Sequence, residues 1–265
     1  MYILFFAVSL LASIIGSICG IGGGVIIKPV LDVTGAVSVS LASFLSGCTV
    51  LSMSIISVFK SFRNKDNAID MHKGTLLAIG GAIGGLIGKN IFQLIYNVVP
   101  DENKVGAIQA VVLVIITLGT FIYTIQADQI KTHHVDNTAA CTIIGLVLGI
   151  FSAFLGIGGG PINIVILSFF FSMGTKQAAS NSLYIIMFSQ LTSLFSTVIN
   201  HNVPVFSVGV LVLMVSGGIL GGMIGNKINK KIDSKTVDKL FIYLMVSIIL
   251  INIYNVFKFI NVLPS

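Results

Sequence analysis

The pentapeptide Gly-Ile-Gly-Gly-Gly occurs twice in this chain, at residues 20–24 and again at residues 156–160. Both copies lie inside long apolar stretches that contain almost no charged side chains. Consecutive glycines destabilise a helix by about 1 kcal/mol each, and backbone freed inside hydrocarbon must regain its hydrogen bonds from protein or from water in a cavity. We therefore expect each copy to break a membrane helix at depth. Two matched breaks of this kind indicate a transport site.

The composition places the chain among integral membrane proteins. Of its 265 residues, 55% are hydrophobic and 9% are charged, and the mean hydropathy is +1.03, outside the range of soluble domains. The net charge of +6 lies mainly in connecting segments, which is typical of charges that set topology beside anionic lipid; no nucleic-acid partner is expected. Cys19, Cys48 and Cys141 lie in apolar segments with no paired motif, so we predict no disulfide, no metal and no cofactor.

Six runs are long enough to cross about 30 Å of hydrocarbon as ordinary helices. They are residues 36–59, 74–99, 105–125, 177–200, 205–226 and 240–257. The regions 2–33 and 139–173 would each exceed about 45 Å as a single helix, so each must bend, and the glycines mark the place. Residues 1–18 lack the positive n-region of a cleaved signal peptide, so this segment is expected to remain. The predicted fold class is an all-α integral membrane protein with about eight membrane segments.

A second glycine motif is also duplicated. Gly80–Gly88 returns as Gly217–Gly225 at an offset of 137 in the numbering, close to the offset of 136 between the two pentapeptides. Two motifs in the same order at one spacing indicate an internal repeat, with a first half at 1–125, a polar linker at 126–138 and a second half at 139–265. The spacing of four within the second motif puts its glycines on one helix face, which predicts close packing against a neighbouring backbone.

The distribution of Lys and Arg favours two halves that are inverted relative to one another. If each glycine region forms two arms that enter and leave on the same face, eleven cations share one face and four the other, a bias that a simple eight-crossing chain lacks. The larger group is Lys60, Arg63, Lys65, Lys73, Lys131, Lys176, Lys227, Lys230, Lys231, Lys235 and Lys239; the smaller is Lys28, Lys89, Lys104 and Lys258. We expect the larger group in the cytoplasm and both termini outside, in the cell (cytoplasmic) membrane. The count leaves open whether the arms are re-entrant or fully spanning.

The glycine motifs are also the predicted binding site. Pro161 suits the first turn of a helix, because its missing N–H would be unbonded there anyway. A helix N-terminus presents free amides and the positive end of the helix dipole, which favour an anion by about 0.3–2 kcal/mol. In an inverted repeat two such ends would face one small anion near the midplane. The backbone candidates are Gly22, Gly23, Gly24, Gly158, Gly159, Gly160 and Pro161.

Polar side chains on neighbouring spans are candidates to line the path, because hydroxyl and amide donors suit a weakly hydrated oxyanion. Those predicted to contact substrate are Ser43, Ser46, Ser180, Asn181, Gln190 and, just inside the second half-helix, Asn163; Ser40, Thr49, Ser182 and Ser189 belong to the wider group. Lys28 and Asp32 are four residues apart and would share a helix face. They form either an ion pair or a substrate contact with a proton carrier, and Lys28 has no cationic counterpart in the second half, where Ile164 aligns.

With these motifs the chain resembles the sulfite exporter TauE/SafE family of bacterial and archaeal membrane proteins. The resemblance rests on residues 20–29 and 156–161 and on Gly80–Gly88 with its repeat, and it covers essentially the whole chain. It implies about eight membrane segments and transport of sulfur-containing anions, such as sulfite or organosulfonates, coupled to an ion gradient. One departure is that the second motif continues directly into Pro161, whereas the first has its proline later, at Pro29. We therefore expect the two half-sites to be unequal.

The leading functional prediction is a secondary transporter, not an enzyme, for a small anion that contains sulfur or a carboxylate. An anion channel is the alternative, because anion permeation requires no ring of pore charge. A membrane enzyme or assembly factor is disfavoured, because the apolar segments contain almost no titratable groups, and no Walker motif for ATP use is present. The expected partners are the anion and the lipid bilayer. The sequence leaves open a coupling ion, H⁺ or Na⁺, and a homo-oligomer.

Overall fold

The computed structural model describes residues 2–63, 69–99 and 101–261, and within these ranges every regular element is a helix. The helices before the linker are α1 (Tyr2–Cys19), α2 (Gly24–Thr34), α3 (Val39–Arg63), α4 (Met71–Val98) and α5 (Glu102–Gln126). A short 3-10 turn, η1 (Ala127–Gln129), opens the linker. After it come α6 (Thr138–Leu155), α7 (Gly160–Phe171), α8 (Thr175–Ile199), α9 (Val208–Lys231) and α10 (Ser234–Asn261).

Eight of the described helices are long and apolar enough to cross a membrane, and they confirm the predicted class. The six ordinary spans expected from the sequence correspond to α3, α4, α5, α8, α9 and α10. The other two are α1 and α6, each of 18 residues. By contrast α2 and α7 have only 11 and 12 residues, about 16–18 Å at 1.5 Å per residue and so about half the hydrocarbon thickness.

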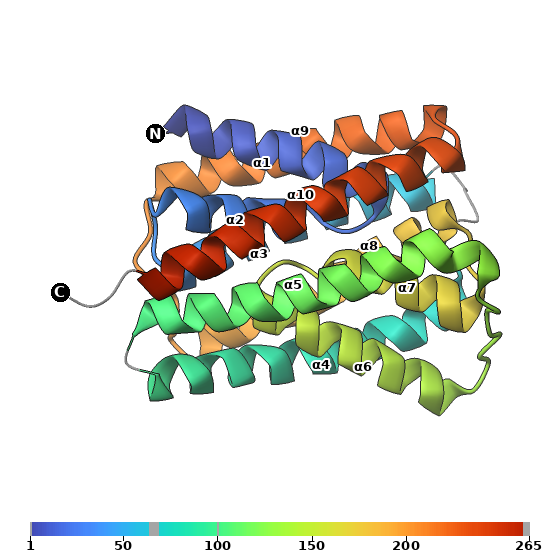
Figure 1. Cartoon of the computed structure of the whole chain (residues 1–265), viewed down its shortest axis with the longest axis horizontal. Helices are drawn as coiled ribbons and strands as arrows, with labels where there is room; N and C mark the ends of the chain where they lie inside the picture. Colours follow the sequence, from blue (N-terminus) through green and yellow to red (C-terminus); the bar gives the residue numbers. More distant parts are fainter. Residues whose placement is uncertain (1, 64–68, 100, 262–265) are drawn as a thin grey trace.

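Each glycine motif is the place where a long helix ends and a short one begins. α1 ends at Cys19 and α2 begins at Gly24, and in the same way α6 ends at Leu155 and α7 begins at Gly160. After each break the chain reverses, so that α2 returns to the end of the bundle where α1 starts, and α7 returns to the end where α6 starts (Figure 1). The breaks expected from the glycines are therefore present. α2 and α7 start near the middle of the molecule and point in opposite directions (Figure 1).

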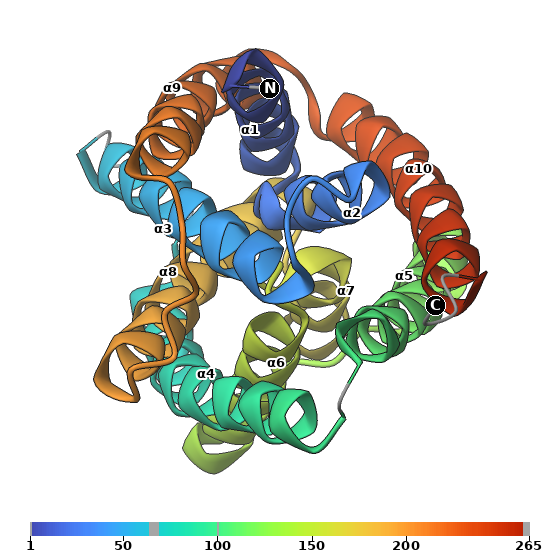
Figure 2. The same ribbon diagram turned by 90° about the vertical axis from the view of Figure 1, so that its left-hand side faces the viewer.

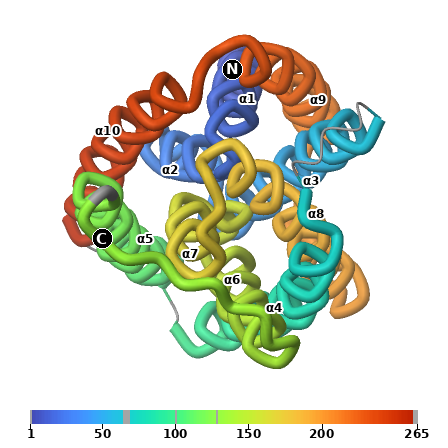
Figure 3. The backbone as a smooth tube through the Cα atoms, turned by 90° about the vertical axis from the view of Figure 1, so that its right-hand side faces the viewer, coloured from blue at the N-terminus to red at the C-terminus, as the bar shows by residue number. Residues whose placement is uncertain are grey.

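Seen end-on, the short helices occupy the interior of the bundle. Figure 2 and Figure 3 show α2 and α7 towards the middle, with α1, α9, α3, α8, α4, α5 and α10 placed around them. α3 and α8 also contact one another. The helix ends that present unpaired amides are thus surrounded by protein, which is the condition under which irregular backbone is tolerated at membrane depth.

The two 18-residue helices α1 and α6 each pack against a long, glycine-rich helix. α1 lies against α9, and α6 lies against α4. Glycines make these contacts close: a Cβ on Gly84 would collide with the carbonyl of Leu146, and a Cβ on Gly221 would lie 2.6 Å from the carbonyl of Leu10. Leu10 and Leu146 are themselves separated by the offset between the two pentapeptides. The structure confirms that the Gly80–Gly88 and Gly217–Gly225 motifs serve helix packing.

The two ends of the bundle differ in charge. One end, which we call the basic end, carries the end of α3, the start of α4, the linker, the α7–α8 turn and the α9–α10 turn (Figure 3). These segments hold the larger cationic group predicted from the sequence, although Lys65 lies outside the described residues. In the linker, Asp136 pairs with Lys73 at 2.6 Å. The hydrogen bond and charge of that ammonium hold the pKa of Asp136 below its ordinary value.

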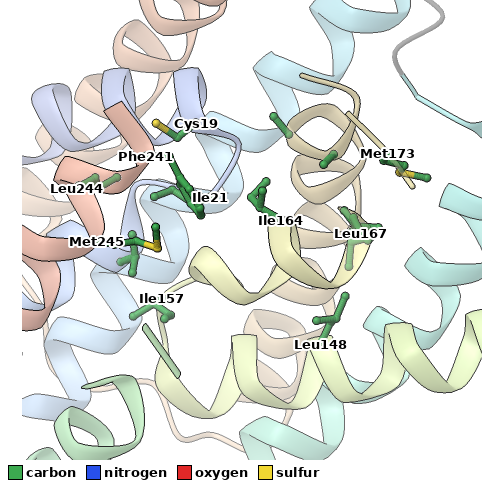
Figure 4. Close-up of a cluster of buried hydrophobic side chains, with 14 of the residues drawn as sticks. Cys19, Ile21, Leu148, Ile157, Ile164, Leu167, Met173, Phe241, Leu244 and Met245 are labelled. Atoms are coloured by element: carbon green, nitrogen blue, oxygen red, sulfur yellow. The ribbon is translucent and has the colours of Figure 1, made fainter. Parts of the chain in front are cut away.

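A hydrophobic cluster anchors both glycine loops through their isoleucines. Ile21 is 0% exposed and Ile157 is 1% exposed. Both belong to one cluster that includes Phe241 and Met245 of α10 and Leu167 of α7, as the close-up in Figure 4 shows. Burying one such side chain contributes about 1.5–3 kcal/mol in a soluble protein. The isoleucine of each pentapeptide therefore fixes the position of its loop while the glycines on either side shape the backbone.

Candidate functional site

The two glycine loops meet at the centre of the bundle. A Cβ placed on Gly22 would lie 3.3 Å from the carbonyl oxygen of Gly158, 3.4 Å from Val50 and 3.5 Å from Ile186. One placed on Gly158 would lie 2.5 Å from Cγ1 of Val50 and 3.4 Å from Ile186. Val50 on α3 and Ile186 on α8 are separated by the same offset in the chain as the two glycines. Residues that are separated by the repeat offset in the sequence therefore contact one another around this point.

Glycine is required here for backbone reasons as well as for space. Gly22 has φ +74° and Gly158 has φ +79°, a left-handed conformation that costs other L-residues about 1–2 kcal/mol. The loops are not identical, however, because Gly23 has φ −68° and its counterpart Gly159 has φ +101°. Pro161 occupies the first turn of α7, where its absent N–H removes no hydrogen bond.

Two serines of α3 lie against the two glycine loops. The hydroxyl oxygen of Ser43 would lie 2.9 Å from a Cβ on Gly156, and that of Ser46 would lie 2.8 Å from a Cβ on Gly24. Gly24 also packs against the carbonyl of Ile157. Because Ser43 and Ser46 are three residues apart, they share a face of α3. That face therefore contacts the second loop at its start and the first loop where α2 begins.

Several buried polar atoms close to the loops have no hydrogen-bond partner. Asn163 is 1% exposed, and neither its Oδ1 nor its Nδ2 is bonded. Its amide nitrogen would lie 2.5 Å from a Cβ on Gly159. The hydroxyls of Ser43, Ser46 and Ser182 are likewise buried and unpartnered. An unpaired buried polar group costs about 1–3 kcal/mol, so the three residues that lie against the loops, Asn163, Ser43 and Ser46, call for an explanation.

The loop amides add further free donors. Gly22 and Gly23 donate to no backbone carbonyl among the described residues, and the same holds for Gly158 and Gly159. Neither N-terminus carries a side-chain cap, because the residues before α2 and α7 are Gly23 and Gly159. The positive ends of both helix dipoles thus remain unneutralised near the middle of the bundle. This arrangement of neutral donors can bind an anion without a cationic side chain.

Comparison with known proteins fixes the family. The model of the family described as "Sulfite exporter TauE/SafE" matches residues 5–252. The chain belongs to the TauE/SafE family. A TauE/SafE relative is the "Probable membrane transporter protein YunE" of Bacillus subtilis (strain 168), which is 24% identical over 229 residues, covering 76% of this chain and 80% of the relative. No solved structure matches. The chain is therefore a multi-pass membrane protein of a transporter family.

The charged pair of this TauE/SafE protein lies beside the first loop, on α2. Lys28 Nζ donates to Asp32 Oδ2 at 2.7 Å, and each side chain is 4% exposed. The ion pair left open by the sequence is thus present, and Asp32 Oδ1 remains unpartnered. α10 covers this region: Asn255 Nδ2 donates to the carbonyl of Pro29, Asn255 Oδ1 is unpartnered, and Lys258 donates to the carbonyls of Asp32 and Val33.

Three other residues of the TauE/SafE chain that were predicted to contact substrate form hydrogen bonds within the protein. Ser180 donates to the carbonyl of Lys176 and lines a small cavity towards the basic end. Asn181 donates to the carbonyl of Gln177 and accepts from the amide of Asp70, so it holds the start of α4. Gln190 donates to Ser152 in the last turn of α6. A helix turns about 100° per residue, so Ser180, Asn181 and Ser182 cannot share one face. Of these three, Ser182 has the unpartnered hydroxyl.

Two apolar residues at the TauE/SafE loops were not expected from the sequence. Val50 and Ile186 are apolar residues with no functional group that would mark them as part of a site. Only the spacing between the two pentapeptides, which also separates Val50 from Ile186, could have paired them. Gln109 on α5 was also missed; its amide donates to the carbonyl of Phe154 close to the second break, and its Oε1 is unpartnered. No sequence signal distinguished it from an ordinary buried glutamine.

Proposed function

We propose that this protein is a secondary transporter of small sulfur-containing anions, such as sulfite or an organosulfonate, bound between the two glycine loops. The observation that carries the proposal is the group of unpartnered donors beside the two uncapped helix N-termini: Asn163, Ser43 and Ser46, with the free loop amides. Family membership and the name of the Bacillus subtilis relative support transport. An anion would supply the missing partners of these groups and so repay the cost of leaving them unpaired.

The transport cycle would follow from an inverted repeat. In this proposal residues 1–125 and 139–265 are the two halves, joined by the linker 126–138, and α1–α2 and α6–α7 are re-entrant arms. The crosswise packing of α1 on α9 and of α6 on α4 supports it, as do the opposite directions of α2 and α7 (Figure 1). Rocking of one half against the other around the loops would open the site to each side in turn. The basic end would face the cytoplasm and both termini the outside.

The buried pair on α2 would couple transport to a cation gradient. Asp32 has one carboxylate oxygen bonded to Lys28 and the other without a partner. That free oxygen would take H⁺ or Na⁺ when Lys28 turns towards the bound anion. Such intramembrane ionisable residues are expensive and typically mark ion pathways. The pair lies only in the first half, because Ile164 stands at the position of Lys28 in the second.

Counterflow in liposomes tests the proposal. Purified protein reconstituted in liposomes loaded with unlabelled sulfite should accumulate radiolabelled sulfite, and Gly158→Leu with Gly159→Leu should abolish this while membrane insertion persists. Gly119→Leu is the matched control, because nothing lies within 4 Å of a Cβ at Gly119. Retained counterflow in the Gly158→Leu, Gly159→Leu variant would refute the loop site. Sulfite conductance without counterflow would identify a channel instead.

A further inference from the structure

A depression at the basic end gathers four cations from two neighbouring helix ends. Lys60 and Arg63 come from the last turns of α3, and Lys227 and Lys230 from the end of α9. Together with Asn226 these side chains line a volume of about 380 Å³. Lys60 donates to the carbonyl of Met223 at 3.3 Å. Among the described residues, Lys60, Arg63 and Lys227 form no ion pair with an acidic side chain.

Helix ends often carry cations for general reasons, because these complement the helix dipole and set membrane topology. The repeat provides an internal comparison that goes beyond this. By the offsets of the two glycine motifs, Lys60 corresponds to Ser196, Lys227 to Asn90 and Lys230 to Gln93. At the opposite end a depression of about 420 Å³ beside these positions is lined by Gln93, Glu102 and His201 and, among the described residues, by no Lys or Arg. The fold therefore does not itself require cations at such a mouth.

A small polar cavity adjoins the basic depression. It has a volume of about 20 Å³, which is enough for one water molecule. Its polar lining consists of Ser17, Ser57, Ser61, Ser180, Asn226 and Asn229, together with apolar Val58, Ala179 and Leu183. Asn226 lines both the depression and the cavity. The cationic surface is thus continuous with a group of neutral hydrogen-bonding side chains inside the bundle.

The inner cavity reaches the first glycine loop. Ala179 packs against Gly20, and Asn229 Nδ2 donates to the carbonyl of Ile18 at 2.5 Å, in the last turn of α1. Ser17 and Ser57 share a hydrogen bond at 3.2 Å, and Asn226 Nδ2 donates to the carbonyl of Ser57 at 3.4 Å. These bonds close the route in the present conformation. Their hydroxyl and amide donors are groups that an anion can engage once the bonds separate.

We propose that the depression formed by Lys60, Arg63, Asn226, Lys227 and Lys230 binds a free oxyanion of the sulfite or sulfonate type at the basic end and feeds it to the glycine loops. The inference rests on the proposed function, because it adds a docking site to the same pathway. The charged residues that line this recess are, among those that the structure describes, all cations. A recess lined by one sign of charge raises the local concentration of counter-ions and their association rate by about 10–10³-fold. A lipid phosphate has the same chemistry, so the experiment must separate the two sources.

The test measures binding of radiolabelled sulfite to purified protein in phosphatidylcholine nanodiscs at low salt. The background is the Gly158→Leu, Gly159→Leu variant, which removes the proposed loop site and isolates the depression. Adding Lys60→Ser and Lys227→Asn introduces the residues found at the equivalent positions of the repeat, Ser196 and Asn90, and should weaken binding by about tenfold or more. The control pair, Lys231→Asn and Lys235→Asn, removes the same charge at the same end from residues that do not line the depression, and it should leave binding unchanged.

Each outcome decides the docking site separately from the loop site. Equal sulfite affinity in the Lys60→Ser, Lys227→Asn variant and in its control would overturn the docking site, and so would an absence of sulfite binding to the background protein. The depression would instead be a lipid site if the protein retained phosphatidylglycerol through Lys60 and Lys227 and sulfite did not displace it. That result would also overturn the proposal. The loop site is tested separately, by counterflow in the Gly158→Leu, Gly159→Leu variant that keeps Lys60 and Lys227.

Discussion

Gly22 and Gly158 occupy the same position in the two pentapeptides, and at the centre of the bundle a Cβ on Gly22 would stand 3.3 Å from the carbonyl oxygen of Gly158. Val50 and Ile186 border both glycines and are separated by the same offset in the chain. The point where the loops meet is therefore tightly packed. Its residues form equivalent pairs, Gly22 with Gly158 and Val50 with Ile186. Substitutions there should act through identifiable neighbours.

Gly158→Ala should destabilise the protein for two separable reasons. The positive φ imposes about 1–2 kcal/mol of backbone strain, and the new methyl would lie 2.5 Å from Cγ1 of Val50, which adds about 1–3 kcal/mol of overpacking. Val50→Ala should relieve the second cost but not the first. Thermal unfolding of the two single variants and the double variant gives the coupling energy. Strictly additive effects would show that Val50 and Gly158 do not interact.

Asn163→Leu should abolish anion binding at the glycine loops without destabilising the fold. Both polar atoms of Asn163 are buried and unbonded, so an apolar replacement of similar size removes their unpaired cost and should leave stability unchanged or raise it by up to about 1–3 kcal/mol. Asn181→Leu is the contrast, because it breaks two hydrogen bonds and should lower stability while sparing sulfite binding. Unfolding temperature and sulfite binding check this, measured on both variants with Lys60→Ser and Lys227→Asn added so that the basic depression does not contribute. Normal binding by Asn163→Leu would exclude this residue from the site.

Substitutions of the Lys28–Asp32 pair should distinguish its effect on stability from its effect on coupling to an ion gradient. Asp32→Asn leaves the Lys28 ammonium buried and uncompensated, at a cost of about 3–5 kcal/mol in unfolding free energy. Replacing both residues, with Lys28→Met and Asp32→Leu, should restore stability because no charge remains buried. In liposomes this double variant should retain sulfite counterflow but lose accumulation driven by an H⁺ or Na⁺ gradient. Gradient-driven accumulation at the wild-type rate would mean that the pair is only structural.

The sequence predicted the backbone of this protein better than its side-chain contacts. Glycine clusters and apolar run lengths report local properties, so the breaks before Gly24 and Gly160 and the six long spans could be placed from the chain alone. Ser180 and Asn181 differ from Ser182 in the direction that each takes from α8, and an uncertainty of one residue, about 100° around the helix, reassigns them. The contact of Val50 with Gly158 depends on how α3 crosses the loops, which no local pattern encodes. The repeat offset was the only long-range signal, and it relates residues that meet around the loops.

The crosswise packing of α1 on α9 has a consequence for how the chain is made. About 200 residues separate the two helices, and at about 5–20 residues per second a ribosome needs about 10–40 s to synthesise α9 after α1 has entered the membrane. During that time α1 presents its face to lipid or to the insertion machinery instead of to its final partner. An amino-terminal fragment that ends in the linker would still lack α9. Maturation is therefore completed only late in synthesis, and a stalled or truncated chain is exposed to membrane quality control.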